Sequence, residues 1–216
     1  ILAELDKSLE NSNRYPDRSH NLLREAIAEY LHEITQEKLS KNEVWAANGS
    51  NEILQQILQA FSDPGALAVG FEPSYSMHKI LSEVNGYQYI SLPRDKNFLI
   101  DQKAAVDYLT SNEPRIVFIT TPNNPTGTST NLSDLEILIK AAPNAIFVVD
   151  EAYGEFSQNQ SAISLIRKYS NLFVTRTMSK AFAFAGARIG YVTAQAQTIA
   201  ALTLTRLPYH LSLQSQ

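Results

Sequence analysis

Residues 115–150 read RIVFITTPNNPTGTSTNLSDLEILIKAAPNAIFVVD, and this stretch predicts the fold. Its two ends, 115–121 and 145–150, are apolar runs of the length expected for strands that are buried on both faces. Between them, residues 132–141 carry leucine and isoleucine at helical spacing. A strand, a helix and a second strand in this order predict two parallel strands joined by a helical crossover.

The same alternation of strands and helices continues on both sides of this stretch. The fold class is therefore α/β, with a mostly parallel sheet flanked by helices, and we expect residues 1–216 to form one domain. The chain opens at Ile1 inside a helical pattern and ends at Gln216 without a stop signal, so we expect it to be part of a longer protein. We predict further helices at 19–34, with Ser19 at the N-cap, after Gly49, at 74–85 and at 101–111, and further strands ending at Gly49 and at 66–70, 87–93, 171–177 and 188–194.

The composition is that of a globular protein. Apolar residues make up 44% and charged residues 19% of the 216 residues, and the formal net charge is -4. No run of lysine and arginine indicates a nucleic-acid or membrane surface. The absence of cysteine excludes disulfides, thiolate metal sites and cysteine nucleophiles, and we predict no metal site. The sequence shows neither a signal peptide nor an apolar run as long as a membrane span, and we expect a cytoplasmic location.

Ligands of such sheets bind beyond the carboxyl ends of the strands, so the loops that follow the strands carry the information on function. GSNE, at 49–52, opens a helix whose first amides can hold an anion such as phosphate, with Ser50 and Asn51 beside it. The alternative interpretation is a plain N-cap. PNNPTGT, at 122–128, is a rigid turn that also places amide donors, Asn124 among them, at the ligand edge of the sheet.

DEAY, at 150–153, puts a carboxylate at the end of an apolar strand, where it needs a cation or a hydrogen-bond donor. A magnesium-holding strand of a nucleotide triphosphatase is one alternative, but the G-x-x-x-x-G-K-[ST] loop that it requires is absent, as is G-x-G-x-x-G. Paired-carboxylate glycosidase chemistry is another alternative. It is disfavoured because Asp150 and Glu151 are adjacent on a strand and point to opposite faces.

TRTMSKAFAFAGAR, at 175–188, brings two hydroxyls and two cations to the same edge. Thr177, Ser179 and Arg188 describe a phosphate cradle, which leaves Lys180 as a surplus cation among small and apolar residues. Lys180 either reaches solvent or pairs with a carboxylate, or it is a nucleophile held in an apolar pocket. A lysine, an acid, an anion site and an aromatic face, here Tyr75, are the groups that pyridoxal phosphate requires.

With these motifs the chain resembles the pyridoxal-phosphate aminotransferases of the aspartate-aminotransferase fold, the fold-type I enzymes, and most closely their histidinol-phosphate branch. The resemblance spans nearly the whole chain, and the lysine segment is its most specific part. The matching stretches are NRYPD at 13–17, GSNE at 49–52, PSYSMH at 73–78, PNNPTGT at 122–128, VVDEAYGEF at 148–156, RTMSKAFAFAGARIGY at 176–191 and PYHLS at 208–212.

The resemblance implies a role for each site residue. Lys180 is implied to form a Schiff base with pyridoxal phosphate, and Asp150 to pair with the ring nitrogen. Asn124 and Tyr153 are implied to hold the ring hydroxyl oxygen, with Tyr75 stacked on the ring. The catalytic set would be Lys180, Asp150 and Tyr153, the phosphate would lie among Ser50, Asn51, Thr177, Ser179 and Arg188, and Tyr15 would reach the phosphate region of the partner subunit in a homodimer.

The resemblance also implies the reaction. Residues 1–216 would be the cofactor-binding large domain, without the small C-terminal domain and the N-terminal segment of the family. The activity implied is amino transfer between histidinol phosphate and 2-oxoglutarate, giving imidazole acetol phosphate and glutamate, in histidine biosynthesis. A threonine-phosphate decarboxylase, an aromatic aminotransferase and a non-catalytic regulatory domain that binds pyridoxal phosphate remain alternatives.

Overall fold

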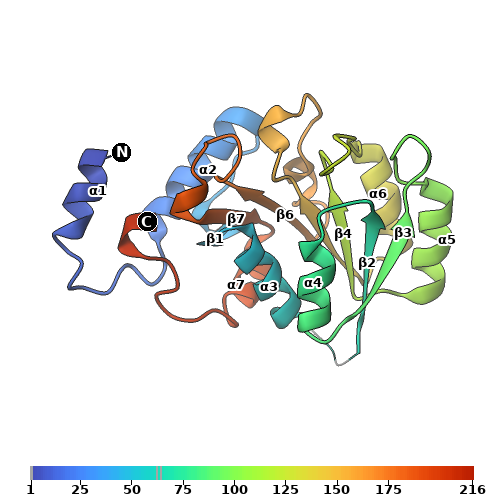
Figure 1. Cartoon of the computed structure of the whole chain (residues 1–216), viewed down its shortest axis with the longest axis horizontal. Helices are drawn as coiled ribbons and strands as arrows, with labels where there is room; N and C mark the ends of the chain where they lie inside the picture. Colours follow the sequence, from blue (N-terminus) through green and yellow to red (C-terminus); the bar gives the residue numbers. More distant parts are fainter. Residues whose placement is uncertain (1, 62, 64) are drawn as a thin grey trace.

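The structure is a computed structural model that describes residues 2–61, 63 and 65–216. Within this part of the chain, seven strands form one sheet in the order β1-β7-β6-β5-β4-β2-β3 (Figure 1). The strands are β1 (Val44–Asn48), β2 (Leu67–Glu72), β3 (Gln88–Pro93), β4 (Ile116–Thr120), β5 (Ile146–Asp150), β6 (Leu172–Thr177) and β7 (Ile189–Thr193). The helices are α1 (Leu2–Leu9), α2 (Asn21–Thr35), α3 (Ser50–Ala60), α4 (Met77–Val84), α5 (Gln102–Asn112), α6 (Leu132–Ala141) and α7 (Ala196–Leu202), with 3-10 turns η1 (Lys41–Glu43), η2 (Gly154–Phe156), η3 (Ala162–Leu165), η4 (Ala185–Ala187) and η5 (Leu213–Ser215).

The prediction of a mostly parallel sheet is confirmed. Strands β3, β2, β4, β5 and β6 pair in parallel, whereas β7 is antiparallel to both β6 and β1. The reversal occurs because residues 178–188 turn back beside β6 instead of crossing the sheet through a helix. The register pairs Thr120 with Asp150, so the last residues of β4 and β5 lie side by side at one edge of the sheet.

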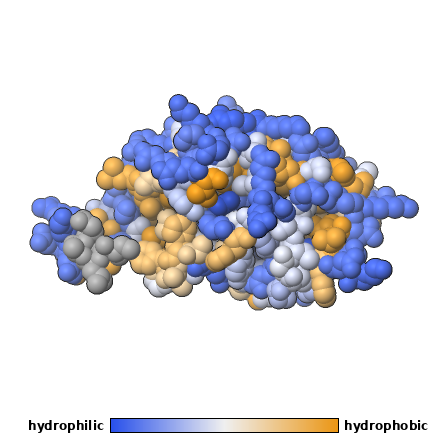
Figure 2. Space-filling model, turned by 90° about the horizontal axis from the view of Figure 1, so that it is seen from above, coloured by the Kyte–Doolittle hydropathy of each residue, from blue (hydrophilic) through white to orange (hydrophobic). Residues whose placement is uncertain are grey.

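Helices cover both faces of the sheet. Along β4, Val117 and Ile119 pack in the cluster that includes α2, α5 and α6, whereas Ile116 and Phe118 pack in the cluster that includes α3 and α7. Burying a side chain of this size contributes about 1.5–3 kcal/mol, which explains why these strands read as unbroken apolar runs. Figure 2 shows that the face seen from above is largely hydrophilic, with apolar groups in separate patches. Among the described residues, no helix is both long and apolar enough to cross a membrane.

The start of α2 differs from the prediction. Ser19 is not the N-cap; the helix begins at Asn21 after His20, whose backbone is left-handed with φ 35° and ψ 51°. The Asp17 carboxylate accepts hydrogen bonds from the amides of Ser19 and Asn21, each at 2.9 Å. Asp17 therefore satisfies amides near the helix start from outside the predicted range, and the Ser19 hydroxyl is not used for this.

His20 is buried at 2% exposure against Trp45, with ring centroids 4.4 Å apart. Burial, and then electrostatic interactions with His210 and Arg24, lower the pKa of His20 to about 3. The folded protein therefore holds this imidazole neutral at pH values where an unfolded histidine takes a proton.

We expect this histidine to make stability pH-dependent. Between about pH 6.5 and 3 the unfolded state binds the additional proton, so stability that is present above pH 6.5 is lost as the pH falls. Between pH 7 and 5 the free energy of unfolding of the wild type should fall by about 1–2 kcal/mol more than that of His20→Asn. Asparagine tolerates the left-handed backbone at this position, which makes it the matched replacement. Urea titrations at several pH values measure the difference, and parallel curves for the two proteins would contradict it.

Candidate active site

A cavity of about 230 Å³ opens at the edge of the sheet where β4, β5 and β6 end. All of the site residues predicted from the sequence except Tyr15 line this cavity. It also includes three residues that were not predicted, Thr120, Ala152 and Ala185. The full lining consists of Ser50, Asn51, Tyr75, Thr120, Asn124, Asp150, Ala152, Tyr153, Thr177, Ser179, Lys180, Ala185 and Arg188.

Asp150, the last residue of β5, is 2% exposed. Its Oδ1 accepts a hydrogen bond from the Ala152 amide at 3.0 Å, and its Oδ2 lies 3.1 Å from Nε2 of His78. His78 is itself buried and stacks on Phe118, with ring centroids 4.8 Å apart and planes 9° apart. Sequence reasoning missed His78, although it lies three residues after Tyr75 in the PSYSMH stretch. The carboxylate that the sequence predicted to need a partner has one on each oxygen.

Glu151 points away from Asp150, as the alternation of a strand predicts. Its carboxylate lies 2.7 Å from Nη2 of Arg176 and also accepts hydrogen bonds from the Ser161 hydroxyl and the Ala162 amide, both at 2.7 Å. The two adjacent carboxylates therefore serve different partners on opposite sides of the sheet, which excludes paired-carboxylate chemistry between them.

Lys180 is exposed, so the expectation of an apolar pocket around it is wrong. Its Nζ lies 5.5 Å from the centre of the Tyr153 ring. Residues 178–188 form turns and the short η4, with left-handed backbone at Ala183 (φ 50°) and Arg188 (φ 54°). Phe182 of this segment is 40% exposed and packs edge-on against Tyr30, with ring centroids 5.3 Å apart. The ammonium faces a polar cavity that is open to a small molecule.

An anion cradle forms where α3 begins. Gly49 precedes the helix with φ 81°, and a side chain there would meet Nη2 of Arg188 at 2.5 Å. A side chain on Gly190 would lie 2.2 Å from the Ser50 amide nitrogen. These two glycines let β7 and Arg188 approach the first turn of α3, whose free amides carry partial positive charge. The guanidinium and the helix start together favour a phosphate group.

Hydroxyl and amide groups complete this side of the cavity. The Thr177 hydroxyl donates to the Ser179 hydroxyl at 3.0 Å, and the Tyr75 hydroxyl donates to Oδ1 of Asn51 at 3.2 Å. The two asparagines of the 122–128 loop have different positions. Asn123 is 3% exposed and holds the loop through the Pro73 carbonyl and the Thr126 hydroxyl, whereas Asn124 lines the cavity.

Tyr15 does not join the others. Its side chain is 82% exposed and stacks on Tyr209, with ring centroids 4.6 Å apart and planes 24° apart. Its reach toward a partner subunit stays a prediction.

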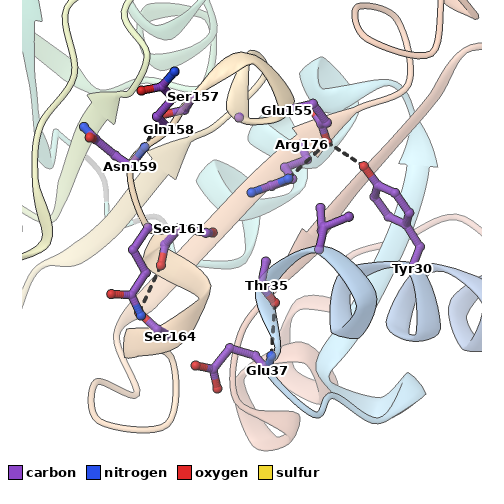
Figure 3. A pocket seen from close by; sticks show the side chains of 13 residues that line it. Tyr30, Thr35, Glu37, Glu155, Ser157, Gln158, Asn159, Ser161, Ser164 and Arg176 are labelled. Carbon is purple, nitrogen blue, oxygen red and sulfur yellow. Dashed lines mark hydrogen bonds and ion pairs between the residues drawn. The ribbon is translucent and has the colours of Figure 1, made fainter.

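A second cavity, of about 510 Å³, lies beside Tyr30, Glu155 and Arg176 (Figure 3). The Arg176 Nη1 lies 3.0 Å from Oε1 of Glu155, to which the Tyr30 hydroxyl also donates at 3.4 Å. Burial and the Glu155 charge raise the pKa of Tyr30 to about 12. Arg176, Glu155 and Tyr30 of the larger cavity bind one another, whereas the lysine, the lone acid and the anion cradle all line the smaller cavity. We therefore place the candidate active site in the smaller cavity.

The fold and this cavity define an α/β sheet domain with a lysine, a buried acid and an anion cradle at one edge. The chain belongs to the aminotransferase class I and II family, whose model matches residues 1–216. Among curated relatives, the histidinol-phosphate aminotransferase of Corynebacterium efficiens is 53% identical over 205 residues, covering 94% of this chain and 55% of the relative. That of Thermobifida fusca is 53% identical over 206 residues, covering 94% and 55%.

Solved structures give the same picture of the fold. The histidinol-phosphate aminotransferase of Clostridium acetobutylicum superposes with a TM-score of 0.84 at 26% identity, over 99% of this chain and 62% of that one. The enzyme of Sinorhizobium meliloti, solved in complex with pyridoxal-5'-phosphate, gives 0.89 at 23% identity, over 99% and 57%. The chain spans between 55% and 59% of the length of the curated relatives it matches.

Proposed function

We propose that the protein is a pyridoxal-phosphate aminotransferase that moves an amino group between histidinol phosphate and 2-oxoglutarate. The observation that carries the proposal is the convergence of Lys180, Asp150 and the cradle of Arg188 and Ser50 on one cavity. The class of reaction is supported by the family, and the substrate by the names of the Corynebacterium and Thermobifida relatives.

The residues present fit the cofactor. Pyridoxal phosphate supplies an aldehyde that condenses with amines and a ring that withdraws electrons from the resulting adduct. Arg188, the Ser50 and Asn51 helix start, Thr177 and Ser179 match a phosphate dianion in charge and in hydrogen-bond donors. Glycines at 49 and 190 allow Arg188 and β7 to approach the helix start closely.

The side chains divide the remaining work. The Nζ of Lys180 would supply the primary amine that condenses with the aldehyde, with loss of water, and as a free amine it would carry a proton to and from the reacting carbon. Asp150 would hold a proton at the ring nitrogen of the bound cofactor, and His78 and the Ala152 amide fix the orientation of its carboxylate. Tyr75 supplies an aromatic face, and Asn124 and Tyr153 supply donors for the ring hydroxyl oxygen. Holding the ring in one position lowers the entropy cost of bringing the reacting groups into the geometry that the reaction requires.

We further propose that the active unit is a homodimer in which Tyr15 serves the partner's phosphate site. The Tyr15 side chain supports this, because it is exposed and does not line the candidate cavity of its own chain.

The test compares the full-length protein with residues 1–216. We expect the full-length protein to form imidazole acetol phosphate from histidinol phosphate and 2-oxoglutarate, and we expect residues 1–216 to bind pyridoxal phosphate without turnover. A coupled glutamate assay measures the transfer, and absorbance of the bound cofactor measures binding. Release of carbon dioxide from threonine phosphate, or transfer from aromatic amino acids alone, would replace the substrate assignment. Cofactor binding without any transfer by the full-length protein would favour a regulatory domain.

A further inference from the structure

A second group of basic side chains surrounds Trp45, away from the candidate active site. A cavity of about 440 Å³ opens there between the start of α2, β1 and α7. Its polar lining includes Ser19, Arg24, Asn42, Gln197 and Arg206, and it shares no residue with the cavity that holds Lys180.

Neither arginine of this cavity has an acidic partner among the described residues. The Arg24 guanidinium lies 5.5 Å and the Arg206 guanidinium 5.0 Å from the Trp45 ring centre. Arg24 donates from Nε to the carbonyls of Lys41 and Val44 at 3.0 and 2.8 Å, and Arg206 donates from Nη1 to the Thr203 carbonyl at 2.7 Å. In the part of the chain that the structure describes, neither arginine forms an ion pair.

The positive charge at this position is also unbalanced. The pKa of Arg24 is lowered by burial and then by Arg206, and that of Arg206 by burial and then by Arg18. Asp17 is the acid whose charge raises the pKa of Arg24, and its oxygens accept hydrogen bonds from backbone amides of α2 and the preceding turn. A protein of net charge -4 thus places two arginines in the lining of one cavity, with the charge of a third, Arg18, acting on one of them, an arrangement that favours a bound anion.

Buried polar atoms without partners gather around the same indole. Nε of Arg206, Nε2 of His20 and Nδ1 of His210 are all buried and unpartnered among the described side chains. Both histidine rings pack against Trp45, at 4.4 and 5.3 Å between ring centres. Because buried polar groups are nearly always hydrogen-bonded, Nε of Arg206 is a donor that the described side chains leave unused.

We propose that this cavity binds the phosphate monoester of a small organic molecule. Arg24 and Arg206 both line the cavity, and the guanidinium group is the side chain that best matches the oxygens and the charge of a phosphate. The opening is larger than a phosphate group needs, and the α7 residues Ala196 and Ala200 give one wall an apolar surface for a carbon skeleton. Asn42 and Gln197 offer amide groups to hydroxyls of the ligand. This site is independent of the proposed transferase activity.

The chain carries its own probe, because Trp45 is its single tryptophan. Residues 1–216 are titrated with glycerol 3-phosphate and, separately, with inorganic phosphate, at an ionic strength held constant with potassium chloride. We expect a saturable change in tryptophan emission with glycerol 3-phosphate. Arg206→Gln should weaken the apparent affinity by about tenfold or more, as the loss of a charged hydrogen bond implies. Arg188→Gln, in the other anion cradle, is the matched control and should leave the emission titration unchanged.

Several results would overturn the proposal. They are an equal response to potassium chloride alone, an unchanged titration in Arg206→Gln, loss of the response in Arg188→Gln, or binding of inorganic phosphate with exclusion of glycerol 3-phosphate. Circular dichroism shows whether Arg206→Gln is folded. Should it be unfolded, Arg18→Gln provides the second variant, because Arg18 is exposed and adds to the same positive field. An affinity several-fold weaker in Arg18→Gln supports the site, and an unchanged affinity counts against it.

Discussion

Lys180→Ala is expected to abolish covalent attachment of pyridoxal phosphate completely. Among the described residues that line the candidate cavity, Lys180 is the one lysine. No other described side chain there can therefore form a Schiff base with the aldehyde. Borohydride reduction followed by mass spectrometry should find the cofactor on the peptide that contains residue 180 in the wild type and on no peptide in the variant. In the full-length protein the same change should abolish amino transfer.

Two controls separate nucleophilicity from charge. Lys79→Ala removes an exposed lysine on α4 that pairs with Glu83 at 3.9 Å, and it should leave attachment intact. Lys180→Arg keeps the positive charge but not the nucleophilic amine, so it should retain non-covalent phosphate binding without a reducible adduct. Reducible cofactor on Lys180→Ala would show that another lysine carries the chemistry.

The sequence was sufficient to predict that these residues meet. Each predicted strand exists, and the carboxyl ends of parallel strands lie at one edge, so Asp150, Thr177 and the residues after them converge. The sequence did not predict side-chain contacts between residues that are far apart in the chain. The pairing of Asp150 with His78 joins positions 72 residues apart, and no local pattern marks it.

The local failures have physical causes as well. Small and apolar residues around Lys180 suggested enclosure, but the lysine is exposed, and the backbone of its segment is left-handed at Ala183 and Arg188. Ser19 is a residue type that commonly caps helices, but the carboxylate of Asp17 accepts the hydrogen bonds from the amides near the helix start. At both positions the residue types alone did not determine the outcome. The backbone conformation around Lys180 and around Ser19 decided which groups their side chains contact.

The network around Arg176 was not predicted either, and it carries the largest expected effect on stability. The Arg176 side chain is 4% exposed and lies 2.7 Å from Glu151 and 3.0 Å from Glu155. Burial disfavours its charge, but the charges of Glu151 and the neighbouring acids outweigh this and raise the pKa of Arg176. One guanidinium therefore holds two carboxylates that are 5% and 12% exposed.

Arg176→Met should lower the free energy of unfolding by about 3–5 kcal/mol, because it leaves buried carboxylates without a cation. A loss of this size is a large share of the roughly 5–15 kcal/mol that stabilises an ordinary domain. Urea unfolding followed by Trp45 emission measures it. Arg115→Met is the matched control, since Arg115 pairs with Asp63 at 3.3 Å on the surface, with side-chain exposures of 38% and 68%. That change should cost no more than about 1 kcal/mol.

The origin of the loss is tested by removing the charge that Arg176→Met leaves behind. Glu151→Gln in the Arg176→Met background replaces the stranded carboxylate with a neutral amide of nearly the same shape, so it should recover part of the stability, although alone it destabilises. Protonation also neutralises the stranded carboxylate. The loss of unfolding free energy in Arg176→Met relative to the wild type should therefore shrink as the pH falls toward ~4, where glutamate takes up a proton. If the deficit came from lost packing instead, the second substitution would add to the damage, and the deficit would not change with pH.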